Sequence, residues 1–69
     1  MNLKFEVKRH RLSLTQGEAE VLVNGKTVVQ YSDKIELQDG QWKSVHDDAH
    51  FIEAAMRQYS DKIIKLFQN

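Results

Sequence analysis

Apolar and polar residues alternate along much of the N-terminal part of this 69-residue chain. The alternation holds over residues 3–8, over 19–23 and again over 35–37. A period of two is typical of strands with one buried face. Between these segments the apolar positions shift from odd to even numbers at Leu12 and Leu14, which predicts a bulge or bend near Arg9–Arg11.

Two dipeptides, Asn24-Gly25 and Asp39-Gly40, predict tight hairpins, because these residue types tolerate positive φ. Two-residue loops at these points predict three cross-strand pairs: Val23 with Lys26, Val21 with Val28, and Leu37 with Trp42. Apolar residues would then lie on both faces of the sheet.

The C-terminal part of the chain has the pattern of an amphipathic helix. Ser44 followed by Asp47 resembles a capping box, which predicts a helix over about 45–67 that begins just after Ser44. An advance of about 100° per residue gives one apolar stripe. Its members are Val45, Ala49, Ile52, Met56, Tyr59, Ile63, Leu66 and Phe67. We expect this stripe to pack on the sheet, since most helical stability comes from such packing.

These elements predict one small α+β domain over residues 1–69. It consists of an antiparallel β-meander of four to five strands within 2–43, followed by one long C-terminal amphipathic helix packed on one sheet face. Hydrophobic residues make up 41% of the chain, which is enough to form a core.

Composition narrows the classes of function. Cysteine is absent, which excludes disulfides and thiolate metal sites. No segment reaches the roughly 20 apolar residues that span a bilayer, and charges interrupt the N-terminal segment where a signal peptide would be apolar. We therefore expect a soluble cytoplasmic protein without a membrane partner. The net charge of zero lacks the overall basic field typical of nucleic-acid binders.

A His/Asp cluster near the predicted helix start is the densest group of possible metal ligands. His46 and His50 are four residues apart and share one helix face with Glu53, so together they could hold a divalent metal. The alternative is a solvated polar face with acidic residues capping the helix, and short motifs of this kind often arise by chance. We favour the solvated face and expect no cofactor.

The basic segment Lys8, Arg9, His10 and Arg11 could contact phosphates, which would make the chain a nucleic-acid-binding accessory protein. Neighbouring strand residues point to opposite faces, however, and this splits the charge. We favour an edge strand whose charged residues discourage further pairing, and nucleic acid is the less favoured partner.

Apolar surface is the third candidate. Phe51 and Ile64 project away from the predicted stripe, and Tyr31 and Trp42 add aromatic area on the sheet. More apolar surface than one helix can cover indicates an interaction site. We expect these four residues to bind a protein partner, either a second copy in a homodimer or a larger protein.

No arrangement of residues indicates catalysis. The serines and threonines lie in no nucleophile elbow, and the three glycines are too far apart for a phosphate-binding loop. We therefore expect a non-enzymatic protein–protein interaction module without catalytic residues. Nucleic-acid binding and metal binding remain as alternative hypotheses.

Overall fold

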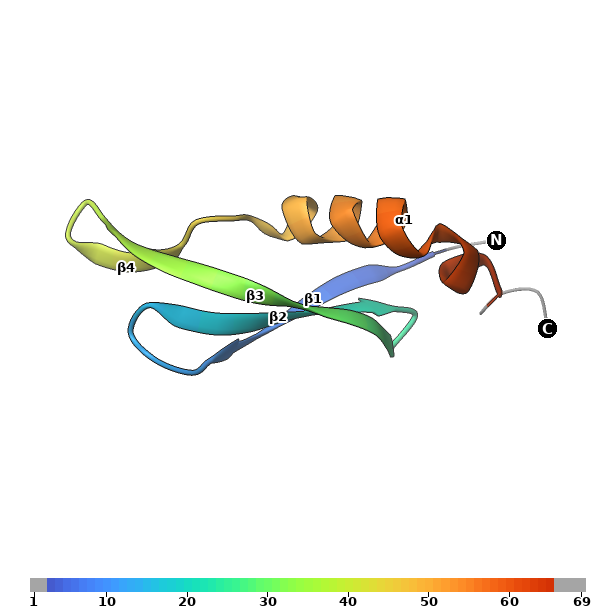
Figure 1. Cartoon of the computed structure of the whole chain (residues 1–69), viewed down its shortest axis with the longest axis horizontal. Helices are drawn as coiled ribbons and strands as arrows, with labels where there is room; N and C mark the ends of the chain where they lie inside the picture. Colours follow the sequence, from blue (N-terminus) through green and yellow to red (C-terminus); the bar gives the residue numbers. More distant parts are fainter. Residues whose placement is uncertain (1–2, 66–69) are drawn as a thin grey trace.

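A four-stranded antiparallel sheet and one helix form the fold (Figure 1). The computed structural model describes residues 3–65. The elements in chain order are β1 (Phe5–Arg11), β2 (Gln16–Val23), β3 (Lys26–Gln38), β4 (Gln41–Ser44) and α1 (Asp48–Lys65). The strand order in the sheet is β1-β2-β3-β4. The predicted α+β fold, a meander followed by one helix packed on one face, is confirmed.

Both predicted hairpin turns are present, and their residues adopt the required backbone conformation. Asn24 and Gly25 have φ of 49° and 82°, and Asp39 and Gly40 have φ of 51° and 79°. These values satisfy the positive φ at both central residues that the tightest hairpins need. Two of the predicted pairs are confirmed: Val23 with Lys26 and Leu37 with Trp42.

The sheet contains one register shift, and it lies elsewhere than predicted. Val21 pairs with Val29 instead of Val28, because the register shifts between Val21 and Leu22 and leaves an extra residue on β3. The bulge predicted near Arg9–Arg11 was wrong, since β1 pairs with β2 in a single register. The shift of the apolar positions from odd to even numbers has a different origin. β1 ends at Arg11, and the apolar residues that follow belong to a loop.

The helix begins at Asp48, and Asp47 caps it by accepting a hydrogen bond of 2.9 Å from the backbone N–H of His50. The predicted start after Ser44 was therefore wrong. Ser44 ends β4, and its hydroxyl donates to the carboxylate of Asp33 instead of accepting from a backbone N–H at the helix start. The predicted stripe residues Leu66 and Phe67 lie outside the described residues.

The helix packs through a stripe that only partly matches the predicted one: Ile63 is buried and Ile52 packs against the core, as expected. Phe51 and Ala55 pack on Ala19 and Val21, and further along Ile63 packs on a second cluster with Val23 and Val28. Several predicted stripe residues are exposed instead: Val45, Ala49, Met56 and Tyr59.

The helix is also irregular, because Tyr59 has non-helical angles (φ −131°, ψ 27°). This kink changes the phase of the residues beyond it, so a regular wheel cannot describe the whole helix. Lys62, beyond the kink, donates to the carbonyl oxygen of Val28 at 3.1 Å and so ties the helix to the bulged part of β3.

The molecule is elongated, with extents of 47 × 18 × 18 Å. Residues Ile35–Gln38 pair with β4 beyond the region where β3 pairs with β2, and this extension forms a two-stranded arm at the end away from the C-terminal part of α1 (Figure 1). We call it the β3–β4 arm. Within residues 3–65, no helix has the length and apolar character needed to cross a membrane.

Gly17 provides a test of the β1–β2 packing. A Cβ at this position would lie 2.8 Å from the backbone carbonyl oxygen of His10, and backbone atoms cannot move aside cheaply. We expect Gly17→Ala to lower the free energy of unfolding by about 1–3 kcal/mol in urea titration. The control Gln30→Ala, at an exposed strand position, should change it by less than about 0.5 kcal/mol. Equal effects of the two substitutions would contradict the close approach.

Candidate functional site

Arg9 links three elements of the fold. Its guanidinium donates to Asp33 Oδ2 on β3 at 3.1 Å, and to Asp48 Oδ1 at the start of α1 at 2.6 Å. It also donates to the backbone carbonyl of His46 at 3.2 Å and lies 5.3 Å from the ring centroid of Phe51. We call Arg9, Asp33 and Asp48 the clamp, because these side chains join β1, β3 and α1.

The clamp is an electrostatic unit with one buried member. Partial burial opposes the charge of Arg9, but the hydrogen bonds and charges of Asp48 and Asp33 outweigh it and raise the pKa of Arg9. Asp33 is buried, and its Oδ2 also accepts a bond of 2.9 Å from Ser44. Its Oδ1 has no hydrogen-bond partner among residues 3–65. A hollow of about 200 Å³ adjoins the clamp, but Oδ1 is buried away from solvent and so cannot serve a ligand there directly.

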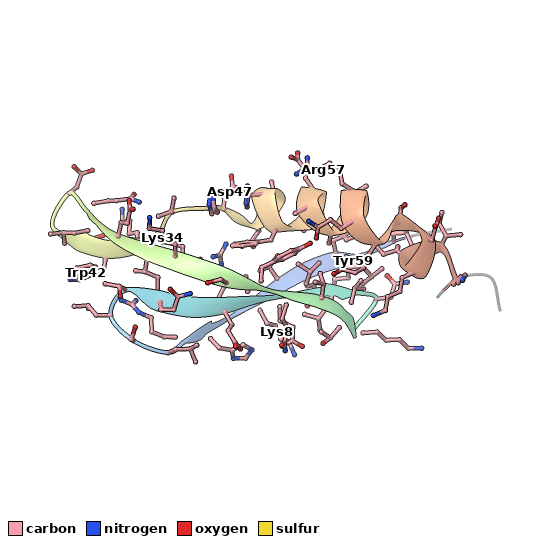
Figure 2. The ribbon with its side chains drawn as sticks, in the orientation of Figure 1. Lys8, Lys34, Trp42, Asp47, Arg57 and Tyr59 are labelled. Carbon is pink, nitrogen blue, oxygen red and sulfur yellow. The ribbon has the colours of Figure 1, made fainter. Side chains whose placement is uncertain are left out.

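The basic segment does not form a basic patch. Arg9 belongs to the clamp, whereas Lys8 lies on the face of the sheet away from α1 (Figure 2). His10 Nε2 lies 3.3 Å from Glu20, and Arg11 donates to the carbonyl oxygens of its own loop. Arg9 and His10 thus lie beside carboxylates, and Arg9 and Lys8 lie on opposite faces of the sheet.

In the His/Asp cluster, the two histidine side chains are stacked on each other. The rings of His46 and His50 lie parallel, with centroids 3.8 Å apart and an interplanar angle of 9°. Ring nitrogens bind a metal in the ring plane, so parallel stacked rings do not converge on one ion. Glu53 is exposed, and Asp47 caps the helix. Within residues 3–65, no three His, Asp or Glu side chains are grouped so that they could hold a metal ion.

The four predicted partner-binding residues divide into buried and exposed groups. The prediction that Phe51 is exposed was wrong: it is 2% exposed and packs in the core, with Tyr31 stacked on it at 5.9 Å. Tyr31 is half-buried and donates to Gln58 Oε1 at 2.8 Å, and burial raises its pKa. Ile64 and Trp42 are exposed. The predicted stripe excluded Phe51 because it was fitted to residues 45–67 as one regular helix, whereas the helix begins at Asp48 and has a kink at Tyr59.

The sheet face away from α1, here called the open face, is polar. Glu20 accepts hydrogen bonds from Thr27 and lies beside His10, while Leu22 is the buried apolar residue of this face. A shallow hollow of about 280 Å³ on it has mainly polar lining. The expectation of apolar surface on both faces was therefore wrong for the open face.

Exposed apolar side chains are spread over several elements, among them Met56 and Ile64 on α1, and some lie in the β3–β4 arm and in the loop after β1. We call four of them the apolar end: Leu12, Leu14, Leu37 and Trp42. The loop with the first two adjoins the arm, since Ile35 N–H donates to Thr15 O at 3.0 Å. Figure 2 shows Trp42 at this end. Sequence reasoning named only Trp42, although the parity change at Leu12 and Leu14 was a signal for loop residues outside the core.

No known protein family, curated protein or solved structure matches this chain.

The clamp yields a test of which of its ion pairs stabilises the fold. The side chain of Asp33 is 4% exposed and that of Asp48 is 61% exposed. We expect Asp33→Ala to lower the free energy of unfolding by about 1.5–3 kcal/mol, as for buried hydrogen bonds to charged groups. Asp48→Ala should lower it by less than about 1 kcal/mol, since exposed pairs contribute little. Urea unfolding of both variants measures the difference, and a larger loss for Asp48→Ala would refute this ranking.

The open face yields a pH-dependent test. Hydrogen bonds from Thr27 and then from His10 lower the pKa of Glu20 in the folded chain. Because the folded pKa is lowered, the stabilisation is present above the ordinary pKa of Glu and is lost as pH falls through the folded value. We expect Thr27→Val to move the pKa of Glu20 back upward in an NMR titration of its side-chain carboxyl. An unchanged pKa would show that Thr27 is not the main cause.

Proposed function

We propose that this chain is a non-enzymatic interaction module that binds a partner protein through the apolar end. The observation that carries this proposal is the exposure of its four large side chains. Leu12, Leu14, Leu37 and Trp42 are 62%, 55%, 59% and 39% exposed. Apolar side chains grouped on the surface of a small protein favour an interaction site, and Trp is enriched among residues that dominate binding energy.

The β3–β4 arm is amphipathic, which supports binding through one side. Leu37 and Trp42 are a cross-strand pair and so project to the same face. Glu36 and Lys43 form the next pair and project to the opposite face, where Lys34 lies 3.3 Å from Glu36. The apolar side is thus backed by a charged side that stays in solvent when the arm docks.

The partner that fits this arm has an apolar groove able to receive a Trp and a Leu from neighbouring strands. The charges behind the arm are of both signs, so the contact does not require a partner of high opposite charge. The clamp and the turn at Asp39-Gly40 hold the arm in place before binding, which limits the entropy lost on association.

Photo-crosslinking tests this orientation. A photoreactive amino acid placed at Leu37, in chain expressed in its native cells, should crosslink to one defined protein. The same group at Lys43, on the other side of the arm, is the matched control and should give little of that product. Equal crosslinking from both positions, or none from Leu37, would contradict the proposal.

A substitution test separates binding from folding. Because both side chains are exposed, the double variant Leu37→Ser, Trp42→Ala should lower the free energy of unfolding by less than about 1 kcal/mol. It should weaken binding of the crosslinked protein at least about tenfold, as measured by calorimetry. Undiminished binding by a folded double variant would overturn the role of the apolar end.

A further inference from the structure

The outer edge of β1 carries unpaired backbone groups along its length. β1 is an edge strand, and in the part of the chain the structure describes no strand lies beyond it. It spans seven residues with one continuous register against β2 and no proline. The other edge strand, β4, has only four residues. A long regular edge is a template for another strand unless it is covered.

The direction of each backbone group follows from the pairing at the two ends of β1. Asn24 N–H donates to Lys4 O, and Leu12 N–H donates to Gln16 O, so residues 4 and 12 turn their backbone groups toward β2. Alternation in an antiparallel pair then turns those of 6, 8 and 10 the same way. Phe5, Val7 and Arg9 therefore present their N–H and C=O groups to the outer edge.

The side chains of β1 are complementary to those of a second β1 strand. Glu6 and Lys8 flank Val7 and project to the open face. In an antiparallel pairing of two β1 strands centred on Val7, Glu6 of each copy lies opposite Lys8 of the other. A register centred on Lys8 would instead place the Lys8 side chains of the two copies opposite each other. A register centred on Glu6 would place the two Glu6 carboxylates opposite each other. Centring on Phe5 would also oppose Glu6 with a lysine, but that residue, Lys4, lies outside β1. Within β1, centring on Val7 places Glu6 opposite Lys8 at both symmetric positions.

At Phe5 and Val7 the helix face of the same edge is apolar, whereas Arg9 on this face belongs to the clamp. Phe5 and Val7 are half-buried, and Val7 packs with Ile52 against the core of Ala19 and Val21. Gln58 on α1 reaches Tyr31 on β3, so helical periodicity places Ile52 and Met56 on the flank of α1 toward β1. Met56 is 47% exposed there. A second copy would cover this flank with its own equivalent residues.

We infer that two copies of this chain associate through antiparallel pairing of their β1 strands, centred on Val7, into one continuous eight-stranded sheet. The interface is symmetric: two Glu6–Lys8 pairs on the open face, two helix flanks facing each other on the other face, and the outward backbone groups hydrogen-bonded between them. This contact uses a different surface from the apolar end and does not depend on the partner binding proposed above.

Charge reversal tests the register. We expect sedimentation equilibrium to show a concentration-dependent dimer. Glu6→Lys opposes two lysines at each pair and should raise the dissociation constant at least about tenfold. The double variant Glu6→Lys, Lys8→Glu restores opposite charges and should return it to within about threefold of the original. Glu53→Lys, an equal charge change at an exposed helix position, is the matched control and should leave it unchanged.

Disulfide trapping tests the same register independently. The chain contains no cysteine, so each introduced thiol is unique. Glu6 and Lys8 of the two copies would form a pair without mutual backbone hydrogen bonds. The Cα atoms of such a pair lie about 4.5 Å apart, which is within the range that a disulfide spans. A mixture of the Glu6→Cys and Lys8→Cys variants should form the mixed disulfide dimer at least about tenfold faster than either variant alone forms its own dimer.

Three results would overturn the inference. The first is a monomer at the highest soluble concentration. The second is mixed disulfide formation no faster than that of the single variants, which would exclude this register. The third is loss of the dimer in the Leu37→Ser, Trp42→Ala variant with no effect of Glu6→Lys, which would assign self-association to the apolar end. Failure of partner binding at the apolar end leaves the β1 dimer intact, so the two proposals can fail separately.

Discussion

The contact of Arg9 with Asp33 and Asp48 sets the geometry on which the rest of the molecule depends. A side chain from the first strand reaches across the sheet to the third and to the start of the helix, so one charge positions three elements. The ring of Phe51 lies against the same guanidinium, and this couples the ion pairs to the apolar core. Ser44 adds β4 through the carboxylate of Asp33. The first residue of the helix, Asp48, thus lies beside Arg9.

Turn chemistry was the most predictable part of the fold, because positive φ is a local property of Asn24-Gly25 and Asp39-Gly40. The α+β arrangement followed from the change of period along the chain. The helix face was not predictable, because the predicted stripe included Val45, which lies before the helix, and ran across the kink at Tyr59. The predicted start after Ser44 was wrong for a separate reason. The hydroxyl of Ser44 is occupied by Asp33, which is distant in sequence, and no local rule reveals such a contact.

For the candidate surface residues too, exposure was predictable where local sequence determines it and not where contacts between distant residues determine it. Ile64 was correctly expected to be exposed, because it falls outside the apolar stripe, and Trp42, which was named as a partner-binding residue, is also exposed. Phe51 was misassigned because its burial depends on contact with Ala19 and Val21, which are distant from it in sequence. The separation of the basic side chains was also not predictable from the sequence, because it depends on the strand register. The pairing of β1 with β2 places His10 beside Glu20.

The position of α1 after all four strands has a consequence for synthesis. The meander pairs strands that are neighbours in the chain, so each hairpin can form soon after it leaves the ribosome. Its apolar face, centred on Ala19 and Val21, stays uncovered until Phe51 has been translated and the clamp can close. During that interval the nascent sheet exposes both an apolar face and the edge of β1, so the growing chain is at its most vulnerable to aggregation or chaperone capture just before its helix emerges.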